Sequence, residues 1–241
     1  MNKILNNGCS FSAGNRNSWE TYCDFLPGEI YNIAKGASGI EAERVKNFLY
    51  KNNSHRERHS ASWREQWPFE LTHFIYQIPS PARQCIYTDL SEEEFYTADI
   101  QFYAKRKYTK SEEYFDENGR KFLWQELRLH YNTKIFNDRE KYLKKALLEI
   151  HNNTKMLRKK WPDIKIIFLR YEENGMPLIY EFCKDWFKRD LADYCNNNNI
   201  TYIYEDNFNT IWFRKNKLTA DKRHLNTAGA KYIADKIIQH L

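Results

Sequence analysis

Short apolar runs alternate with longer stretches of helical periodicity along most of this chain. An apolar run of about four to eight residues bounded by turn residues is typical of a buried strand, and apolar positions three and four apart are typical of a helix. The sequence predicts strands at residues 3–5, 30–34, 71–78, 164–169 and 201–204. It predicts helices at residues 18–26, 40–51, 138–160, 178–194 and 227–239.

This alternation predicts a parallel sheet with helices on both faces. A helix between two strands returns the chain to the same edge of the sheet, so that the strands run in parallel. We therefore expect one α/β domain over residues 1–241, a three-layer α/β/α sandwich around about five strands. Residues at about 85–137 do not fit the alternation, and we expect a helical or irregular insertion there.

Composition narrows the function classes only slightly. Hydrophobic residues make up 41% of the chain, enough for a core, and the formal net charge is +6. That excess suits an anionic glycan or a nucleic acid, but a solvated basic surface is the favoured interpretation and nucleic-acid binding is not expected. Nothing in the sequence specifies an oligomeric state.

The cysteines and the hydropathy of the chain indicate the cellular compartment in which we expect the protein. The five cysteines are scattered, odd in number and never spaced as CxxC, which argues against a disulfide framework or a structural zinc site and favours a reducing compartment. No apolar segment has the length of a signal sequence or a membrane span. We therefore expect a cytoplasmic protein that does not contact a membrane.

A turn of small residues, Gly8-Cys9-Ser10-Phe11-Ser12-Ala13-Gly14, follows the first predicted strand. Such a turn can hold a hydroxyl at the carboxyl end of a strand with backbone N–H groups facing a substrate. Ser10 is then a candidate nucleophile, and its own amide is a candidate oxyanion donor. Taken alone, the segment is better explained as an ordinary turn before a helix.

Gly36 opens the helix predicted after the second strand. A glycine there offers an unobstructed N–H that can stabilise an oxyanion. A glycine needed only for its backbone geometry explains this segment equally well.

Asp221 and His224 lie just before the last predicted helix. An aspartate three residues ahead of a histidine can bind one imidazole nitrogen and leave the other to accept the serine proton. An isolated pair with this spacing is more often part of a surface loop. Under either interpretation, Asn226 or Thr227 would cap the following helix.

The order of these three segments resembles the SGNH/GDSL hydrolase superfamily. Gly8-Cys9-Ser10-Phe11 is similar to the family's first sequence block, residues 32–39 to its second, and Asp221-Lys222-Arg223-His224-Leu225-Asn226 to its fifth. The resemblance implies a flavodoxin-like three-layer fold and ester hydrolysis or acyl transfer without a cofactor. It also implies a catalytic triad of Ser10, Asp221 and His224, with Gly36 as the oxyanion glycine.

Two positions depart from the family pattern. Cys9 stands where aspartate is usual, at a position that carries no chemistry. After the third strand the family has Gly-x-Asn-Asp, whose asparagine donates to the oxyanion, whereas this chain has residues 77–83 without a matching asparagine. Gln77 or Ser80 could supply the donor, and Arg83 could supply a cation that binds substrate. Loss of one oxyanion donor typically costs about 10²- to 10³-fold in rate.

Other candidates are weaker. His55 and His59 are four residues apart, but they lie among charged residues without an HExxH pattern, so a solvated basic face is favoured and no metal is expected. Aromatic and basic residues interleave between 102 and 131, which fits a nucleic-acid or glycan surface, although a half-buried cap is favoured.

These observations favour a serine esterase that acts on an O-acetyl or other short-chain ester. The basic charge and the many aromatic residues suit a carbohydrate ester, or another small-molecule ester, better than a long lipid. Because the third-block asparagine is missing, a weak or inactive SGNH-like protein that binds a glycan, nucleotide or protein is the main alternative. An acyltransferase of polysaccharide modification would use the same triad and is the second.

Overall fold

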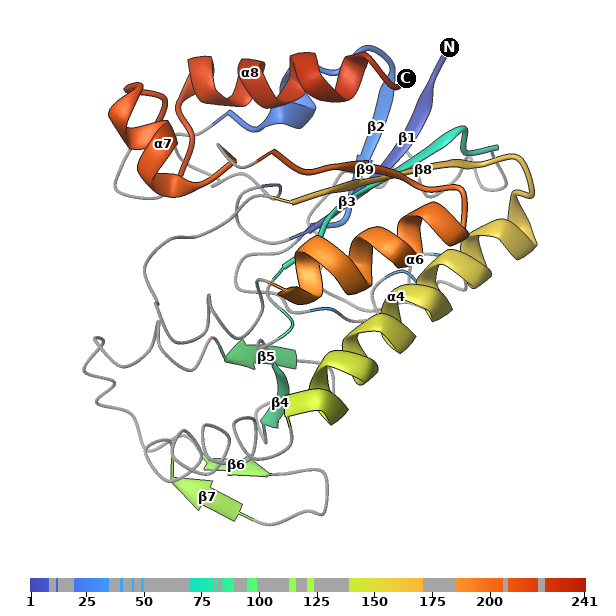
Figure 1. Cartoon of the computed structure of the whole chain (residues 1–241), viewed down its shortest axis with the longest axis vertical. Coiled ribbons are helices and arrows are strands. Elements are labelled where there is room, and N and C mark those ends of the chain that lie inside the picture. The colour runs from blue at the N-terminus through green and yellow to red at the C-terminus, as the bar shows by residue number, and fades with distance from the viewer. Residues whose placement is uncertain are drawn as a thin grey trace.

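Five parallel strands form the central sheet of the computed structural model (Figure 1), in the order β2-β1-β3-β8-β9. The structure describes residues 1–8, 12, 20–34, 40, 45, 49, 70–79, 81, 84–88, 95–98, 113–115, 121–123, 139–170, 185–205, 208–220 and 224–241. The strands are β1 (Lys3–Asn7), β2 (Glu29–Asn32), β3 (His73–Gln77), β8 (Lys165–Leu169) and β9 (Thr201–Ile203). All five predicted strands are confirmed, each end within two residues of its expected position.

The register places the ends of the strands on a common edge. Leu5 of β1 lies opposite Tyr31 of β2 and Phe74 of β3, and every neighbouring pair of strands in this sheet is parallel. The carboxyl ends of β1, β2 and β3 therefore meet at one edge, which is where ligand sites form in open parallel sheets.

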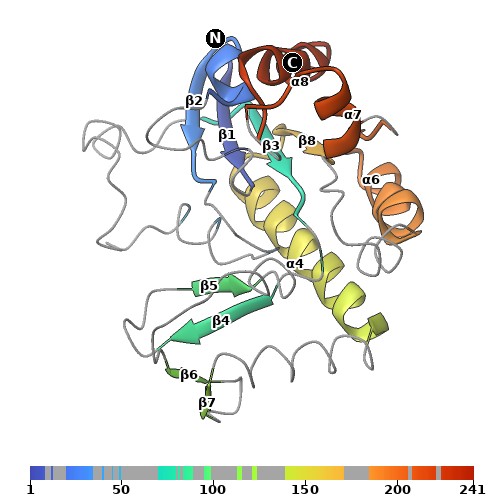
Figure 2. The ribbon, with the colours of Figure 1, turned by 90° about the vertical axis from the view of Figure 1, so that its left-hand side faces the viewer.

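Helices cover both faces of this sheet, as Figures 1 and 2 show. One face carries α4 (Arg139–Lys160), the π-helix η4 (Trp186–Leu191) and α6 (Ala192–Asn197). The other carries the 3-10 helix η1 (Tyr22–Phe25), α7 (Thr210–Lys215) and α8 (Thr227–Ile238). The three-layer α/β/α fold is confirmed, and the ends of α4 and α8 lie within one residue of the prediction.

Each helical layer encloses its own cluster of buried side chains. Because successive side chains of a strand point to opposite faces, Phe74 and Tyr76 of β3 pack in the cluster under α4, and Ile75 packs in the cluster under α8. One cysteine lies in each cluster, Cys195 in the first and Cys23 in the second. Burial raises the pKa of each thiol to about 12.

Three predicted helices differ from the structure or lie partly outside it. Within residues 20–26, only Tyr22–Phe25 are helical, because Thr21 is extended and its capping box with Asp24 starts the helix late. The helix expected at 178–194 is described from residue 185, is π-helical at first and continues to residue 197. Most of the helix expected at 40–51 lies outside the described residues. In the described part of the chain, no helix is long and apolar enough to cross a bilayer.

The insertion between β3 and α4 corrects one expectation. Its described parts form an antiparallel sheet, ordered β5-β4-β6-β7, and not the helical or irregular segment expected at about 85–137. Its strands are β4 (Gln84–Thr88), β5 (Phe95–Ala98), β6 (Glu113–Phe115) and β7 (Lys121–Leu123). Aromatic and β-branched residues, which favour strands, are frequent in these short segments. Figure 2 shows this sheet apart from the parallel one, beside α4.

Candidate active site

His224 lies in a short loop before α8, called the His224 loop, whose described residues are 218–220, 224 and 225. This loop is fastened to the beginning of α8. Asn226 is the N-cap of this helix: its Oδ1 accepts a hydrogen bond of 2.9 Å from the backbone N–H of Gly229. The Nδ2 of the same side chain donates to the carbonyl of Lys217 at 2.8 Å. Asn226, one of the two predicted caps, is therefore confirmed in that role, and it also ties the loop to the end of the preceding segment.

The His224 loop closes on itself and packs on the sheet. The backbone N–H of Ala220 donates to the carbonyl of His224 at 2.9 Å, and Leu225 is buried beside it. Leu225 belongs to the same buried cluster as Leu169 and Ile203, the last residues of β8 and β9. Figure 1 shows the segment between α7 and α8 on the side of the sheet where β9 leads into α7, so the half-buried His224 lies on the side of the strands' carboxyl ends.

Gly8 directly follows β1 and begins the small-residue turn predicted from the sequence. Its φ is +154°, in the region that favours glycine, and its N–H donates to the Asn7 side chain at 2.9 Å. A Cβ added to Gly8 would lie 2.6 Å from the Oγ of Ser12 and 2.9 Å from the Cβ of Gln77. The chain passes so close to these two side chains that this position accepts only glycine.

Ser12 connects the turn to β3 and to η1. Its Oγ lies 2.7 Å from the side-chain Oε1 of Gln77 and 2.8 Å from the hydroxyl of Tyr22. All three side chains are buried, Gln77 at 2% exposure and Tyr22 at 1%. Gln77 is the last residue of β3, so this contact joins the end of that strand to the segment that follows β1.

Two asparagines extend this network to β2. The hydroxyl of Tyr22 donates to Oδ1 of Asn6 at 2.8 Å, and Nδ2 of Asn6 donates to Oδ1 of Asn32 at 3.0 Å. Asn32 in turn donates from its Nδ2 to the backbone carbonyl of Ser12 at 2.8 Å. The network therefore ties the ends of β1, β2 and β3 to Ser12, which lies two residues after Ser10 in the chain.

Two of the predicted site residues, Gln77 and His224, belong to the described part of the chain. Gln77 lies in the polar network and His224 in the loop before α8, both near the carboxyl edge. The other predicted site residues lie outside the described residues, as do the two histidines that were considered as metal ligands: Ser10, Gly36, Ser80, Arg83, Asp221, His55 and His59. Among described residues, no group of three or more His, Cys, Asp or Glu could hold a metal ion.

Sequence reasoning missed four members of the polar network: Asn6, Ser12, Tyr22 and Asn32. A signal for part of it was present, because Asn6 and Asn7 directly follow the apolar Ile4 and Leu5 at the end of the strand, and both asparagines are buried. Buried amides must form hydrogen bonds, so asparagines at the carboxyl end of a parallel strand point to a polar cluster there. The participation of Tyr22 depends on the packing of η1 against the sheet, which no local pattern specifies.

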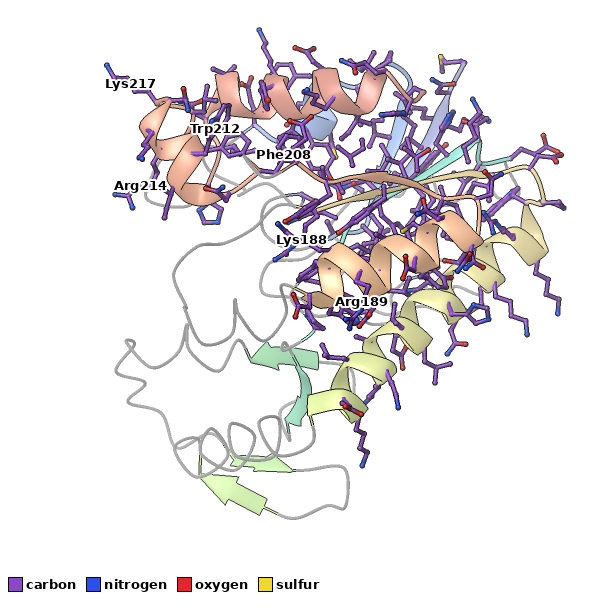
Figure 3. The ribbon with its side chains drawn as sticks, viewed as in Figure 1. Lys188, Arg189, Phe208, Trp212, Arg214 and Lys217 are labelled. Carbon is purple, nitrogen blue, oxygen red and sulfur yellow. The ribbon has the colours of Figure 1, made fainter. Side chains whose placement is uncertain are left out.

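Positively charged side chains lie on the same side of the molecule. Arg170 directly follows β8, is buried, and its Cζ lies 3.5 Å from the ring centroid of Phe187. Figure 3 shows Lys188 on η4 near the ends of the strands, and Arg214 and Lys217 at and just after the end of α7. Lys188, Arg214 and Lys217 are exposed to solvent.

Comparison with known proteins identifies the fold. No protein-family model and no curated protein sequence matches this chain. An acetyl xylan esterase from Butyrivibrio proteoclasticus is 12% identical with a TM-score of 0.50; the match covers 100% of this chain and 63% of the esterase. A member of the lipolytic G-D-S-L family from Veillonella parvula is 14% identical with a TM-score of 0.50, and the match covers 100% of each chain.

A catalytic mutant of an acetylxylan esterase from Geobacillus stearothermophilus is also similar. It is 10% identical with a TM-score of 0.51, and the match covers 99% of this chain and 93% of the esterase. Identity at this level relates folds and does not transfer activities. The chain has the fold of SGNH/GDSL hydrolases.

Proposed function

We propose that this protein is a serine esterase in which Ser10, Asp221 and His224 form the catalytic triad. His224 takes the hydroxyl proton of Ser10 as its Oγ attacks the ester carbonyl carbon, and Asp221 orients and stabilises the imidazolium. The N–H groups of Ser10 and Gly36 donate to the oxyanion. Collapse of the intermediate breaks the ester C–O bond, and His224 returns the proton to the leaving alcohol. Water then hydrolyses the acyl-enzyme by the same route.

The observation that carries the proposal is where two described residues lie, one next to each proposed catalytic segment. Gly8 follows the carboxyl end of β1, and Leu225, the neighbour of His224, lies in the buried cluster that also contains Leu169 and Ile203, the last residues of β8 and β9. These two positions support a site at the carboxyl edge of the sheet, where sites of this fold class form.

A third oxyanion donor is proposed to come from a side chain at or just after the end of β3. Pro79 and Pro81 have no backbone N–H, so the segment that follows β3 has few backbone amides that could donate to the oxyanion. The donor is either the carboxamide of Gln77, at the end of β3, or the hydroxyl of Ser80. Arg83 is proposed to bind the substrate.

The proposed substrate is a short-chain O-acyl ester on a carbohydrate. The acetyl xylan esterases among the similar structures act on such esters, which supports this choice. The exposed cations Lys188, Arg214 and Lys217 favour the approach of a glycan that carries negative charge.

Hydrolysis of p-nitrophenyl acetate and of acetylated xylo-oligosaccharides tests the triad. Ser10→Ala and His224→Ala should each lower kcat/KM by about 10³-fold or more, because either change removes a member of a unit that acts together. His240→Ala is the matched control, since this exposed histidine lies outside the proposed site, and it should keep the wild-type rate. Equal rates for all four proteins contradict the proposal.

The missing third-block asparagine and the two prolines favour a second candidate, a protein that binds an ester or glycan without cleaving it. A fluorophosphonate reacts covalently with an activated serine, so labelling of the wild type but not of Ser10→Ala excludes this candidate. Addition of an acceptor sugar to the acetate assay distinguishes the remaining alternative: an acyltransferase would produce the acetylated sugar in place of free acetate.

A further inference from the structure

Lys217 has a backbone conformation that favours glycine. α7 ends in a Schellman motif, in which the N–H of Leu218 donates to the carbonyl of Phe213 at 2.8 Å and the N–H of Lys217 donates to the carbonyl of Arg214 at 3.1 Å. The residue after the C-cap of such a helix is left-handed and is usually glycine. Lys217 takes this place with a φ of +57°. A side chain there strains the backbone, so lysine makes the protein less stable than glycine would.

No contact within the described part of the molecule uses the side chain of Lys217. This side chain is exposed, and no described residue forms an ion pair or a hydrogen bond with it. Its backbone is fixed, because Nδ2 of Asn226 donates to the carbonyl of Lys217 at 2.8 Å. Strained residues that the surrounding fold holds in place are concentrated at functional positions. The ammonium group of Lys217 is therefore placed for a partner outside this chain.

Two further cations lie in the last turn of α7. Arg214 and Lys215 are exposed, and neither side chain pairs with a described residue. Residues 208–220 contain these three cations and no Asp or Glu, which gives the segment a formal charge of +3. Figure 3 shows the side chains of Arg214 and Lys217 projecting outward at the same end of α7. The carbonyl end of a helix attracts cations in its last turn, which explains Arg214 and Lys215 but not the strained Lys217 beyond it.

An exposed apolar surface accompanies the cations. Ile211 is 50% exposed and Trp212 is half-buried. Each is followed three residues later by a cation, Arg214 and Lys215, and side chains at that spacing are neighbours on the surface of a helix. The Trp212 ring packs on Tyr232 of α8, with ring centroids 5.4 Å apart. This contact holds the indole in place and leaves part of it open to solvent beside the charges.

We propose that Trp212, Arg214, Lys215 and Lys217, together called the α7 surface, bind an acidic glycan whose sugar rings carry carboxylates. The guanidinium and the two ammonium groups bind carboxylates through charge-assisted hydrogen bonds, and the indole packs against the apolar face of a sugar ring. α7 follows β9 and leads into the His224 loop (Figure 1), so the glycan is held next to the loop that contains the proposed base.

The number of cations favours a glycan over a nucleic acid. Proteins that bind DNA commonly contact about 6–10 phosphates, more than the three cations of the α7 surface can neutralise. The choice of a glycan also rests on the proposed function, in which the substrate is a carbohydrate ester. The negative charge of that glycan is inferred from the α7 surface alone.

Calorimetric titration with a hexamer of galacturonic acid tests the α7 surface without ester cleavage, because this hexamer carries no ester. Lys217→Gly should weaken binding about 3- to 10-fold, since it removes one charged contact. The same variant should unfold about 2–4 °C above the wild type, because glycine relieves the left-handed strain. Weaker binding by a more stable protein separates a role of Lys217 in binding from a role in folding.

Two variants serve as matched controls. Asn199 is the other described non-glycine residue with a positive φ, +50°, and it precedes β9 at the opposite edge of the sheet. Asn199→Gly therefore makes the same backbone change away from the α7 surface. Lys155 is an exposed lysine of α4, on the other face of the sheet, and Lys155→Gln removes one positive charge there. Both variants should bind the hexamer as the wild type does.

Several results would overturn the proposal: no binding of the acidic hexamer, equal binding of neutral xylohexaose, or wild-type affinity in Lys217→Gly. A Lys217→Gly protein less stable than the wild type would give Lys217 a structural use and contradict it too. Tighter binding of a single-stranded DNA oligomer, weakened by the same substitution, would assign the α7 surface to nucleic acid instead.

Fluorophosphonate labelling of Ser10 reports on the proposed function separately. If the protein binds the acidic hexamer but is not labelled, the proposed function fails and the α7 surface stands. If Ser10 is labelled and the hexamer does not bind, the α7 surface fails and the proposed function stands.

Discussion

The side chain of Asn226 serves two segments at once, since it caps α8 and holds the end of the segment before the His224 loop. The two functions use different atoms, Oδ1 for the cap and Nδ2 for the carbonyl of Lys217. They can therefore be separated by substitution.

Asn226→Ala should lower the free energy of unfolding by about 1–2 kcal/mol, because it removes an N-cap together with a second hydrogen bond. Asn226→Ser retains a capping oxygen and should lose less stability, yet it also lacks the donor to Lys217. Urea unfolding measures the stabilities. Ester hydrolysis should fall in both variants, because both release the His224 loop; loss of activity in the alanine variant alone would mean that the cap by itself positions the loop.

At this scale the sequence predicts the residues whose role depends on local chain geometry. Asn226 was a predicted cap because it directly precedes an amphipathic helix, and Gly8 began a predicted turn because glycine follows a strand. Tyr22 could not be predicted, because its role depends on a hydroxyl that meets Asn6 and Ser12 only after η1 packs on the sheet. Gln77 was predicted as a donor, and its contact with Ser12 was not foreseen.

At the scale of elements, α8 approaches the His224 loop through a glycine. Gly229 lies in the first turn of α8, and a Cβ added there would collide with the backbone carbonyl of Leu218. The helix can lie this close to the chain because that position has no side chain.

Gly229→Ala should destabilise the protein by about 2 kcal/mol or more, although alanine favours a helix by up to about 1 kcal/mol over glycine. The backbone of Leu218 must move to admit the new methyl group, and the His224 loop moves with it. The control is Ala228→Gly, the reverse change at the exposed neighbouring position, which should cost at most about 1 kcal/mol and keep activity. Thermal unfolding with an acetate assay checks both; a Gly229→Ala protein of wild-type stability would contradict the close approach.

Periodicity predicted the elements of the central fold and failed in the insertion. The five strands and the two longest helices have patterns that extend over several residues and agree with their burial. Strands β6 and β7 have three residues each, as β9 does, but they lie in a stretch where no strand and helix patterns alternate, so no neighbouring element indicates them. Their pairing is set by contacts between segments and not by the segments themselves.

At the scale of the whole molecule, His73 links stability to pH from the edge opposite the candidate site. It is the first residue of β3 and is 3% exposed. Burial, and then the positive charge of Lys165, lower the pKa of His73 below its ordinary value of 6.5. The unfolded chain therefore binds a proton at a higher pH than the folded protein does, and stability is lost as the pH falls below 6.5 toward the lowered pKa.

The free energy of unfolding should rise with pH up to about 6.5 and gain nothing more from His73 above that. His73→Gln should reduce this slope, because glutamine does not titrate. Chemical unfolding at a series of pH values measures this slope. An unchanged slope in His73→Gln would assign the pH dependence to other groups.

The two buried thiols turn the two helical layers into separate reporters of native-state opening. The thiolate is the form of cysteine that attacks an alkylating reagent, and at neutral pH a thiol with a pKa of about 12 is almost entirely protonated. Cys23 and Cys195 therefore react only when their surroundings open. In a chain with Cys9, Cys85 and Cys183 replaced by serine, the alkylation rate of Cys23 follows the opening of the layer that carries η1. The rate of Cys195 follows the layer that carries α6. Equal rates would mean that both layers detach in one cooperative event, and unequal rates would identify the layer that detaches first.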